Sequence, residues 1–180
     1  MDTVHAWLDS IHPLVPQLIG ILAVAAFLLS YQQKSRRSII TLNVTSRVLY
    51  ILQYCLLGAF SGAVLDVLGA IVSIVAEKKN AAFLARHKKA AVIVSNAVIV
   101  VIGLLLYDGW LSLLPIAGVL LHTGAFWLDD ERHIRRLSLL GSPFWFVYNF
   151  GSRAYGSAIG DMLTMISFLI AMARYRKKEL

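Results

Sequence analysis

Two carboxylates stand alone inside long apolar segments. Asp66 lies within "FSGAVLDVLGAIVSIV", residues 60–75, and Asp161 lies within "YGSAIGDMLTMISFLI", residues 155–170. An acid in the hydrocarbon core of a bilayer costs roughly 2.5–3.5 kcal/mol on insertion scales, so it faces a cavity or a polar partner and not lipid. We expect the two acids to bind a solute or a cation, or to carry a proton. The alternative is that each is a helix-start residue at the positive end of a helix dipole.

Further polar and aromatic residues share one face of a predicted helix. Asn43, Arg47, Tyr50 and Tyr54 follow the spacing i, i+4, i+7, i+11. Aromatic rings can bury the faces of a polar organic solute, and amides can fix its orientation. A face of similar type recurs 95 residues later. We therefore predict these residues to bind or transport a substrate: Asp66, Asp161, Gln53, Asn149, Tyr50, Trp145, Tyr54 and Arg47.

Structural roles are the alternative for each member of this set. Membrane helices commonly use amides and hydroxyls for interhelical hydrogen bonds, and they place aromatic residues such as Tyr54 in an interfacial belt. Arg47 either snorkels to the cytoplasmic surface or pairs with an acid or an anionic substrate group. His122, mid-way along a later apolar segment, is either a proton relay or a hydrogen-bonded packing residue.

Enzymatic chemistry has no signature in this sequence. There is no nucleophile elbow, no H-E-x-x-H, no phosphate loop and no Cys/His cluster. The histidines lack metal-ligand spacing, and the single cysteine, Cys55, lies in an apolar stretch. We expect no catalytic residues, no metal and no cofactor.

The composition identifies the elements that must position the polar residues. The chain is 58% hydrophobic and 15% charged, with a mean hydropathy of +0.71. Soluble domains have roughly 45–50% apolar and about 25% charged residues. We predict an all-α membrane protein with one membrane domain, 1–180. Its seven expected transmembrane helices are 13–33, 39–60, 62–75, 90–107, 110–128, 137–155 and 157–173.

Charge distribution predicts the orientation of these seven helices. With the N-terminus outside, the expected cytoplasmic segments hold 15 of the 17 basic residues, all except Arg47 and Arg153. We therefore expect the N-terminus outside and the C-terminus in the cytoplasm. The start, "MDTVHAWLDSIHP", has no Lys or Arg, and we expect no signal peptide. The net charge of +7 is explained by topology anchors at an anionic membrane surface, so we expect no nucleic-acid partner.

An internal repeat relates the two halves. Residues 38–75 align without a gap to residues 133–170, and Asp66 then falls on Asp161. We predict a first three-helix repeat at 13–77, a linker helix at 90–107 and a second repeat at 110–175. Because each triplet starts outside and ends inside, the two repeats are parallel and the linker inverts the chain. Parallel repeats of this kind are a known transporter construction.

This three-plus-one-plus-three layout resembles the SWEET and PQ-loop transporters and the PnuC-type vitamin-precursor transporters. "LLSYQQKSRRSIITLNV" is similar to the end of the first helix in those families, although Tyr31-Gln32 replaces their Pro-Gln. Asp66 and Asp161 stand where their third helices carry an asparagine. With "NFGSRAYGSAIGDMLTMISF", the segment is also similar to the bacterial inner-membrane family YgjV, over most of the chain.

The resemblance implies a multi-pass protein of the bacterial inner membrane and a SWEET-like transporter. It would move a small polar organic molecule by alternating access, with Asp66 and Asp161 available for proton coupling. The expected partners are the lipid bilayer and the solute, and a homo-oligomer is left open. The alternative is a non-transporting partner or regulatory subunit, with the acids paired to Arg47 or Arg153. An ion channel is less favoured, because two unequal acids do not make a symmetric filter.

Overall fold

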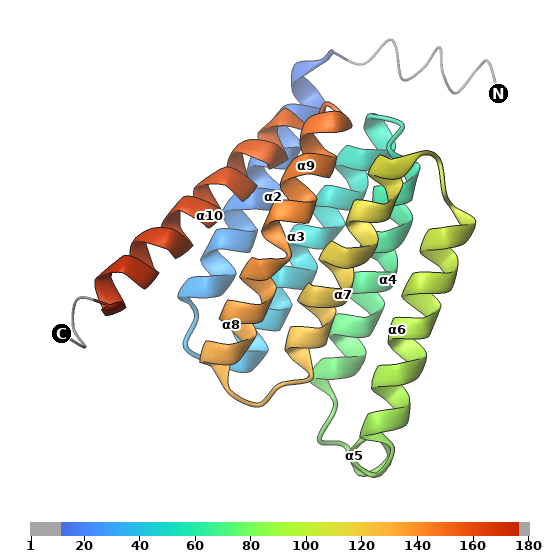
Figure 1. Cartoon of the computed structure of the whole chain (residues 1–180), viewed down its shortest axis with the longest axis vertical. Helices are drawn as coiled ribbons and strands as arrows, with labels where there is room; N and C mark the ends of the chain where they lie inside the picture. The colour runs from blue at the N-terminus through green and yellow to red at the C-terminus, as the bar shows by residue number, and fades with distance from the viewer. Residues whose placement is uncertain (1–11, 177–180) are drawn as a thin grey trace.

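The computed structural model describes residues 12–176, and this range forms helices and no strand (Figure 1). The longer helices pack side by side, and short connections join them at the two ends of the bundle. In chain order the elements are α2 (Leu14–Gln32), α3 (Arg36–Leu56), α4 (Phe60–Glu77), α5 (Ala82–Arg86), α6 (Lys88–Leu105), the 3₁₀ helix η1 (Trp110–Leu113), α7 (Leu114–Phe126), α8 (Glu131–Leu140), α9 (Ser142–Gly151) and α10 (Tyr155–Arg176).

Several helices have the character of membrane spans. In the described range, α3, α4 and α6 are long and apolar enough to cross a bilayer, and Leu14–Ser30 and Trp110–Phe126 are shorter apolar helices. The third expected span, 62–75, is longer than predicted, because α4 begins at Phe60 and ends at Glu77. Residues 1–11, which include Asp2 and Asp9, and the last four residues lie outside the described range.

The sixth expected span, 137–155, is wrong as a single helix. It is divided into α8 and α9 by a turn at Gly141, and α8 already begins at Glu131. Pro143 lies in the first turn of α9, where its missing N–H costs nothing, but the same residue would remove a hydrogen bond from a continuous helix. The sequence "GSP" at 141–143 carried this signal.

Matching turns end α3 and α9. After α3, the Ala59 N–H donates to the Tyr54 carbonyl over 2.9 Å, and Gly58 takes a positive φ of 69°. After α9, the Ala154 N–H donates to the Asn149 carbonyl over 2.8 Å. Both are Schellman-type ends, in which a left-handed residue closes the helix. In the second turn that residue is Arg153, at a φ of 60°.

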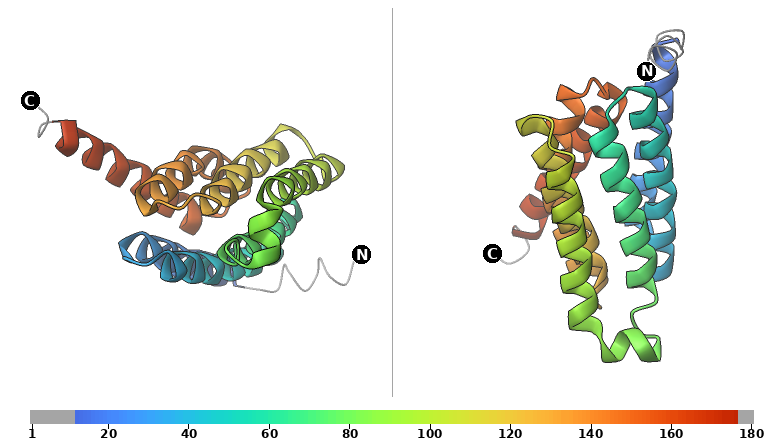
Figure 2. Two further views of the ribbon diagram at one scale, coloured as in Figure 1. Left: turned by 90° about the horizontal axis from the view of Figure 1, so that it is seen from below. Right: turned by 90° about the vertical axis from the view of Figure 1, so that its right-hand side faces the viewer.

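Two helix pairs form the largest contacts between the first and the second half of the chain. α4 packs against α7, and α10 packs against α2. Seen along the bundle, α2 and α3 lie in one layer and α7 to α9 in another (Figure 2, left). Large apolar residues such as Val98 and Leu105 of α6 face outward, whereas the interior holds many polar side chains. Apolar surface outside and polar groups inside are expected of a protein whose solvent is lipid.

Two cations join helix ends at the end of the bundle where α5 lies (Figure 1). The Arg36 guanidinium donates to the carbonyls of Ala76 at 2.5 Å and Phe126 at 2.8 Å, at the ends of α4 and α7. The buried Lys79 ammonium donates to the Trp127 carbonyl at 3.1 Å. Cations bind helix C-termini because the final carbonyls there are unpaired. Arg36 and Lys79 therefore fix α3 and α4 to α7.

An acid in the connection 127–130 completes this arrangement. Asp129 forms ion pairs with Lys79 and Lys88. A hydrogen bond from Lys79 holds the pKa of the Asp129 carboxyl below its usual range, and burial lowers the pKa of Lys79. Asp129 therefore pairs with a lysine that is itself buried.

Candidate functional site

An ion pair lies at the centre of the bundle. Arg47 of α3 and Asp66 of α4 are 2% and 3% exposed, and Nη1 of Arg47 is 2.5 Å from Oδ1 of Asp66. Nε of the same guanidinium donates to the Asn43 Oδ1 atom at 3.1 Å. Gly69 leaves the space that the guanidinium fills, because a Cβ at that position would overlap it. The snorkelling interpretation of Arg47 is therefore wrong.

A second polar chain starts from the other acid. Asp161 of α10 is 6% exposed, and its Oδ2 accepts a hydrogen bond of 2.7 Å from Nδ2 of Asn149 in α9. The Oδ1 atom of that amide accepts a hydrogen bond of 2.6 Å from the Tyr54 hydroxyl in α3. Tyr54 is buried, so it is not part of an interfacial belt. This chain links α3, in the first half of the sequence, to α9 and α10 in the second.

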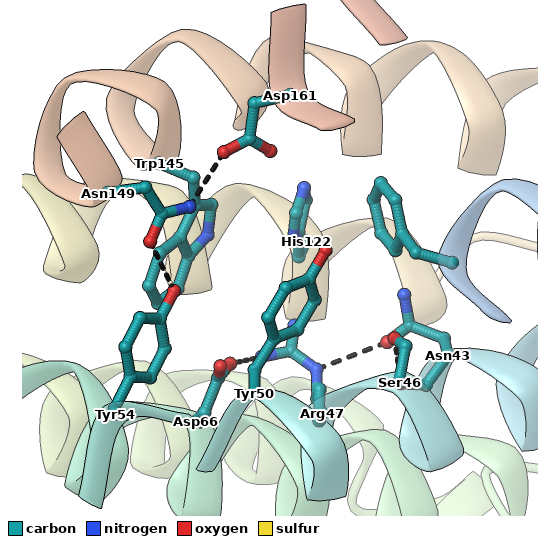
Figure 3. Close-up of a pocket in the computed structure, with 11 residues that line it drawn as sticks. Asn43, Ser46, Arg47, Tyr50, Tyr54, Asp66, His122, Trp145, Asn149 and Asp161 are labelled. Atoms are coloured by element: carbon teal, nitrogen blue, oxygen red, sulfur yellow. Dashed lines mark hydrogen bonds and ion pairs between the residues drawn. The ribbon is translucent and has the colours of Figure 1, made fainter. Parts of the chain in front are cut away.

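Both acids line one small cavity of about 20 Å³ (Figure 3). In the close-up, the Arg47–Asp66 pair lies on one side and Asp161 with Asn149 lies on the other. About 10–15 Å³ of such volume holds one water molecule, so the cavity accepts a water-sized group. Its lining is Phe27, Asn43, Ser46, Arg47, Tyr50, Tyr54, Asp66, His122, Trp145, Asn149 and Asp161.

Seven of the eight predicted site residues are in this lining, and Gln53 is the exception. Gln53 is fully buried and its Oε1 atom accepts a hydrogen bond from the Ser157 hydroxyl of α10. Successive residues of a helix point about 100° apart, so Gln53 and Tyr54 cannot share one face. Gln53 therefore joins α3 to α10 beside the cavity and does not line it.

Aromatic rings form the walls of the cavity. The Tyr54 ring stacks on the Trp145 indole with centroids 6.1 Å apart, and it stacks on Tyr50 at 6.2 Å. On another side, Phe27 of α2 lies 5.5 Å from the His122 imidazole. Phe27 and Ser46 were not predicted. Phe27 belongs to a uniformly apolar segment, so no polar periodicity marked it.

His122 of α7 belongs to the same lining. Its ring is bound to the backbone carbonyl of Ser138, and its Nε2 atom has no described hydrogen-bond partner. A Cβ at Gly141 would overlap the edge of this ring, so the absence of a side chain at Gly141 leaves room for it. His122, expected to be either a proton relay or a packing residue, thus lies in the cavity lining.

Three polar atoms of lining residues are buried without a described partner: Nη2 of Arg47, Nε2 of His122 and Nε1 of Trp145. Buried polar groups are normally hydrogen-bonded, and unsatisfied ones cost free energy. Among the described residues, no group of three or more His, Cys, Asp or Glu side chains could hold a metal ion. The arrangement is chemically suited to binding a small polar or charged group.

The fold and this interior define a helical membrane protein with a buried, charged and aromatic-lined cavity. A family model described as Imp-YgjV, bacterial inner membrane protein, matches residues 14–179. The chain belongs to this family and is a multi-pass protein of the bacterial inner membrane. No curated protein and no solved structure matches the chain.

Proposed function

We propose that the protein is a small SWEET-like transporter that moves a small polar organic molecule through the central cavity by alternating access. The observation that carries this proposal is the cavity itself, which is lined by an ion pair, an additional acid and aromatic rings. Ionisable groups inside a membrane are costly, and they commonly mark substrate or ion pathways. No chemical conversion of the solute is part of the proposal.

Reciprocal hydrogen bonds support two parallel three-helix repeats. Gln53 bonds to Ser157, and the residues 95 positions away repeat this contact in reverse, since the Tyr148 hydroxyl accepts the Gly62 N–H at 2.8 Å. Tyr54 and Asn149, themselves 95 residues apart, bond to each other. Contacts that exchange in this way are expected of two units related by a twofold axis. The cavity then lies beside that axis.

Helix packing supports the same arrangement. The third helix of each proposed repeat packs on the first helix of the other, as α4 on α7 and α10 on α2. α6 then acts as the linker and lies against α4 and α7. In this proposal the triplets rock against each other about the cavity, which becomes accessible from each side in turn.

Positions of the connections support the proposed orientation. The basic segments around 33–37 and 78–89 meet at one end of the bundle, where α8, which carries Arg132, Arg135 and Arg136, also begins (Figure 1). Short cytoplasmic loops carry the excess of Lys and Arg. In the proposed orientation this end faces the cytoplasm and the N-terminus lies outside.

A non-transporting partner subunit remains the second candidate, and two observations favour it. Arg47 already neutralises Asp66, and the cavity is only large enough for a water-sized group. A closed polar core of this kind would also result from a purely structural network. The two candidates differ in whether the cavity opens to the two aqueous phases.

Cysteine accessibility tests this difference without knowledge of the solute. Ser46 lines the cavity and is fully buried, so Ser46→Cys in a Cys55→Ser background places one thiol there. A membrane-impermeant thiol reagent is applied to right-side-out and to inverted membrane vesicles. A transporter exposes the thiol to each side in turn, so the thiol is labelled in both kinds of vesicle.

Ser73→Cys in the same background is the matched control. Ser73 is also fully buried, but its hydroxyl bonds to the Gly69 carbonyl and does not line the cavity. We expect no labelling of this thiol from either side. If Ser46→Cys is equally unreactive from both sides, the transporter proposal fails and the partner-subunit role is favoured.

A further inference from the structure

The cavity contains an uneven set of charges. Its ionisable lining residues are Arg47, Asp66, Asp161, His122 and the two tyrosines Tyr50 and Tyr54. Arg47 pairs with Asp66, whereas the ion pairs among the described residues include none with Asp161. With both acids ionised and His122 neutral, the cavity therefore has one negative charge more than it has positive charges.

Asp161 has only a neutral partner among the described residues. The Asn149 amide donates to Oδ2 at 2.7 Å, and no hydrogen bond to Oδ1 is described. The acid is 94% buried, since its exposed fraction is 6%. A buried carboxylate is stable only when it is paired with a cation and hydrogen-bonded. A cationic ligand would supply what Arg47 supplies to Asp66.

His122 is a second, independent group that would bind the same kind of ligand. His122 is 6% exposed, and its ring is held by the Ser138 carbonyl. A neutral imidazole that donates one N–H has an acceptor at its other nitrogen, and Nε2 of His122 is the nitrogen without a partner. Asp161 and His122 therefore both offer acceptors to an N–H donor.

Aromatic walls favour a cation over a neutral donor. Tyr50, Tyr54 and Trp145 line the cavity together with Phe27. The face of an aromatic ring attracts an ammonium group, and the attraction increases when the group is desolvated.

We propose that the cavity selects a small organic ammonium compound, whose cationic nitrogen binds Asp161 and His122 between the aromatic rings. This inference rests on the transporter function proposed above and names the charge class of its substrate. The size of the cavity limits the buried group to one comparable to water, which an unsubstituted ammonium satisfies.

Three small compounds of similar shape test this proposal. Ethanolamine is a cation at neutral pH, ethylene glycol is neutral and glycolate is an anion, and each carries a hydroxyl. Their binding to the full-length purified protein is measured by thermal stabilisation at constant ionic strength, with sodium chloride as the reference salt. We expect ethanolamine to bind about tenfold or more tightly than either of the others.

Variants assign this preference to Asp161. Asp161→Asn is expected to remove the preference for ethanolamine, while Asp161→Glu keeps the charge and retains it. Asp129→Asn removes an acid that lies outside the cavity and should leave the preference unchanged. A cooperative thermal transition of Asp161→Asn itself shows that the loss in this variant does not come from misfolding.

Three results would overturn the inference: equal binding of ethylene glycol or glycolate, equal stabilisation by sodium chloride, or an unchanged preference in Asp161→Asn. Failure of the inference alone is distinguishable from failure of the transporter function. If none of the compounds binds but the Ser46→Cys thiol is labelled from both sides, only the cation preference is wrong. If that thiol is also unreactive, the transporter proposal fails with it.

Discussion

Asp66 and Asp161 align when residues 38–75 are set against residues 133–170, but their side chains have different partners. The Arg47 guanidinium pairs with Asp66, whereas the Asn149 amide binds Asp161. The cause lies in the sequence, because the residue 95 positions after Arg47 is Ser142 and the residue 95 positions after Tyr54 is Asn149. One acid therefore has an ion pair, and the other has a neutral hydrogen bond.

This difference predicts effects of unequal size for the same Asp→Asn substitution at the two positions. Asp66→Asn leaves the buried Arg47 charge without its counterion, and we expect it to lower the free energy of unfolding by about 3–5 kcal/mol. Asp161→Asn strands no cation and should cost less than about 1 kcal/mol. Denaturant unfolding in detergent, followed by helical circular dichroism, measures both changes.

A double variant separates the ion pair from local packing. Arg47→Gln combined with Asp66→Asn removes both charges, so it should be less destabilising than Asp66→Asn alone. Equal losses for Asp66→Asn and Asp161→Asn would mean that the Arg47–Asp66 pair has no special role in stability.

The turns that end α3 and α9 share one backbone conformation but differ in the type of residue that adopts it. α3 closes with a glycine in the left-handed conformation, and α9 closes with Arg153 in the same conformation. A left-handed backbone costs an L-residue with a side chain roughly 1–2 kcal/mol. No atom lies within 4 Å of a Cβ placed at Gly58, so substitution there tests the backbone alone.

Arg153→Gly is therefore expected to stabilise the protein by about 1 kcal/mol, because glycine adopts a positive φ without strain. The Arg153 side chain is exposed and forms no ion pair with a described residue. Its removal therefore costs little stability. Gly58→Ala is the complementary change and should destabilise by about 1–2 kcal/mol. Destabilisation by Arg153→Gly, measured by the same unfolding assay, would show that the arginine side chain outweighs the backbone strain.

Sequence periodicity predicted the elements whose signal is local. The face that contains Arg47, Tyr50 and Tyr54 was visible because one helix carries it, and these residues do line the cavity. The ring contact of Phe27 with His122 joins different helices, so only tertiary packing brings it about. Arg153 could not be predicted at a positive φ, because its residue type avoids that conformation.

At the scale of the whole molecule, polar groups gather along the line where the two halves meet. The Tyr54–Asn149 and Gln53–Ser157 bonds both cross from one half to the other. At the end of the bundle near α5, Arg36 and Lys79 bind the last carbonyls of α7 from the other half. If the two halves rock against each other as proposed, these contacts must either break or move together with the halves. The contacts of Arg36 and Lys79 are therefore the candidates for a gate at that end of the bundle.

The orientation in the membrane decides which side such a gate would face, and two exposed positions test it. Phe83 of α5 is 75% exposed at the basic end of the bundle, and Asp108 lies in the connection between α6 and η1 at the other end. In the Cys55→Ser background, we expect Phe83→Cys to react with an impermeant thiol reagent in inverted vesicles only. Asp108→Cys should react in right-side-out vesicles only.

This expectation follows from the placement of charge. Lys and Arg in short loops are retained on the cytoplasmic side, and the segment 78–89 holds five of the 17 basic residues. Lys78→Ser together with Lys89→Ser lowers that number and should weaken the orientation without touching the cavity. The reverse labelling pattern for Phe83→Cys and Asp108→Cys would place the Arg36 and Lys79 contacts on the periplasmic side, and the gate with them.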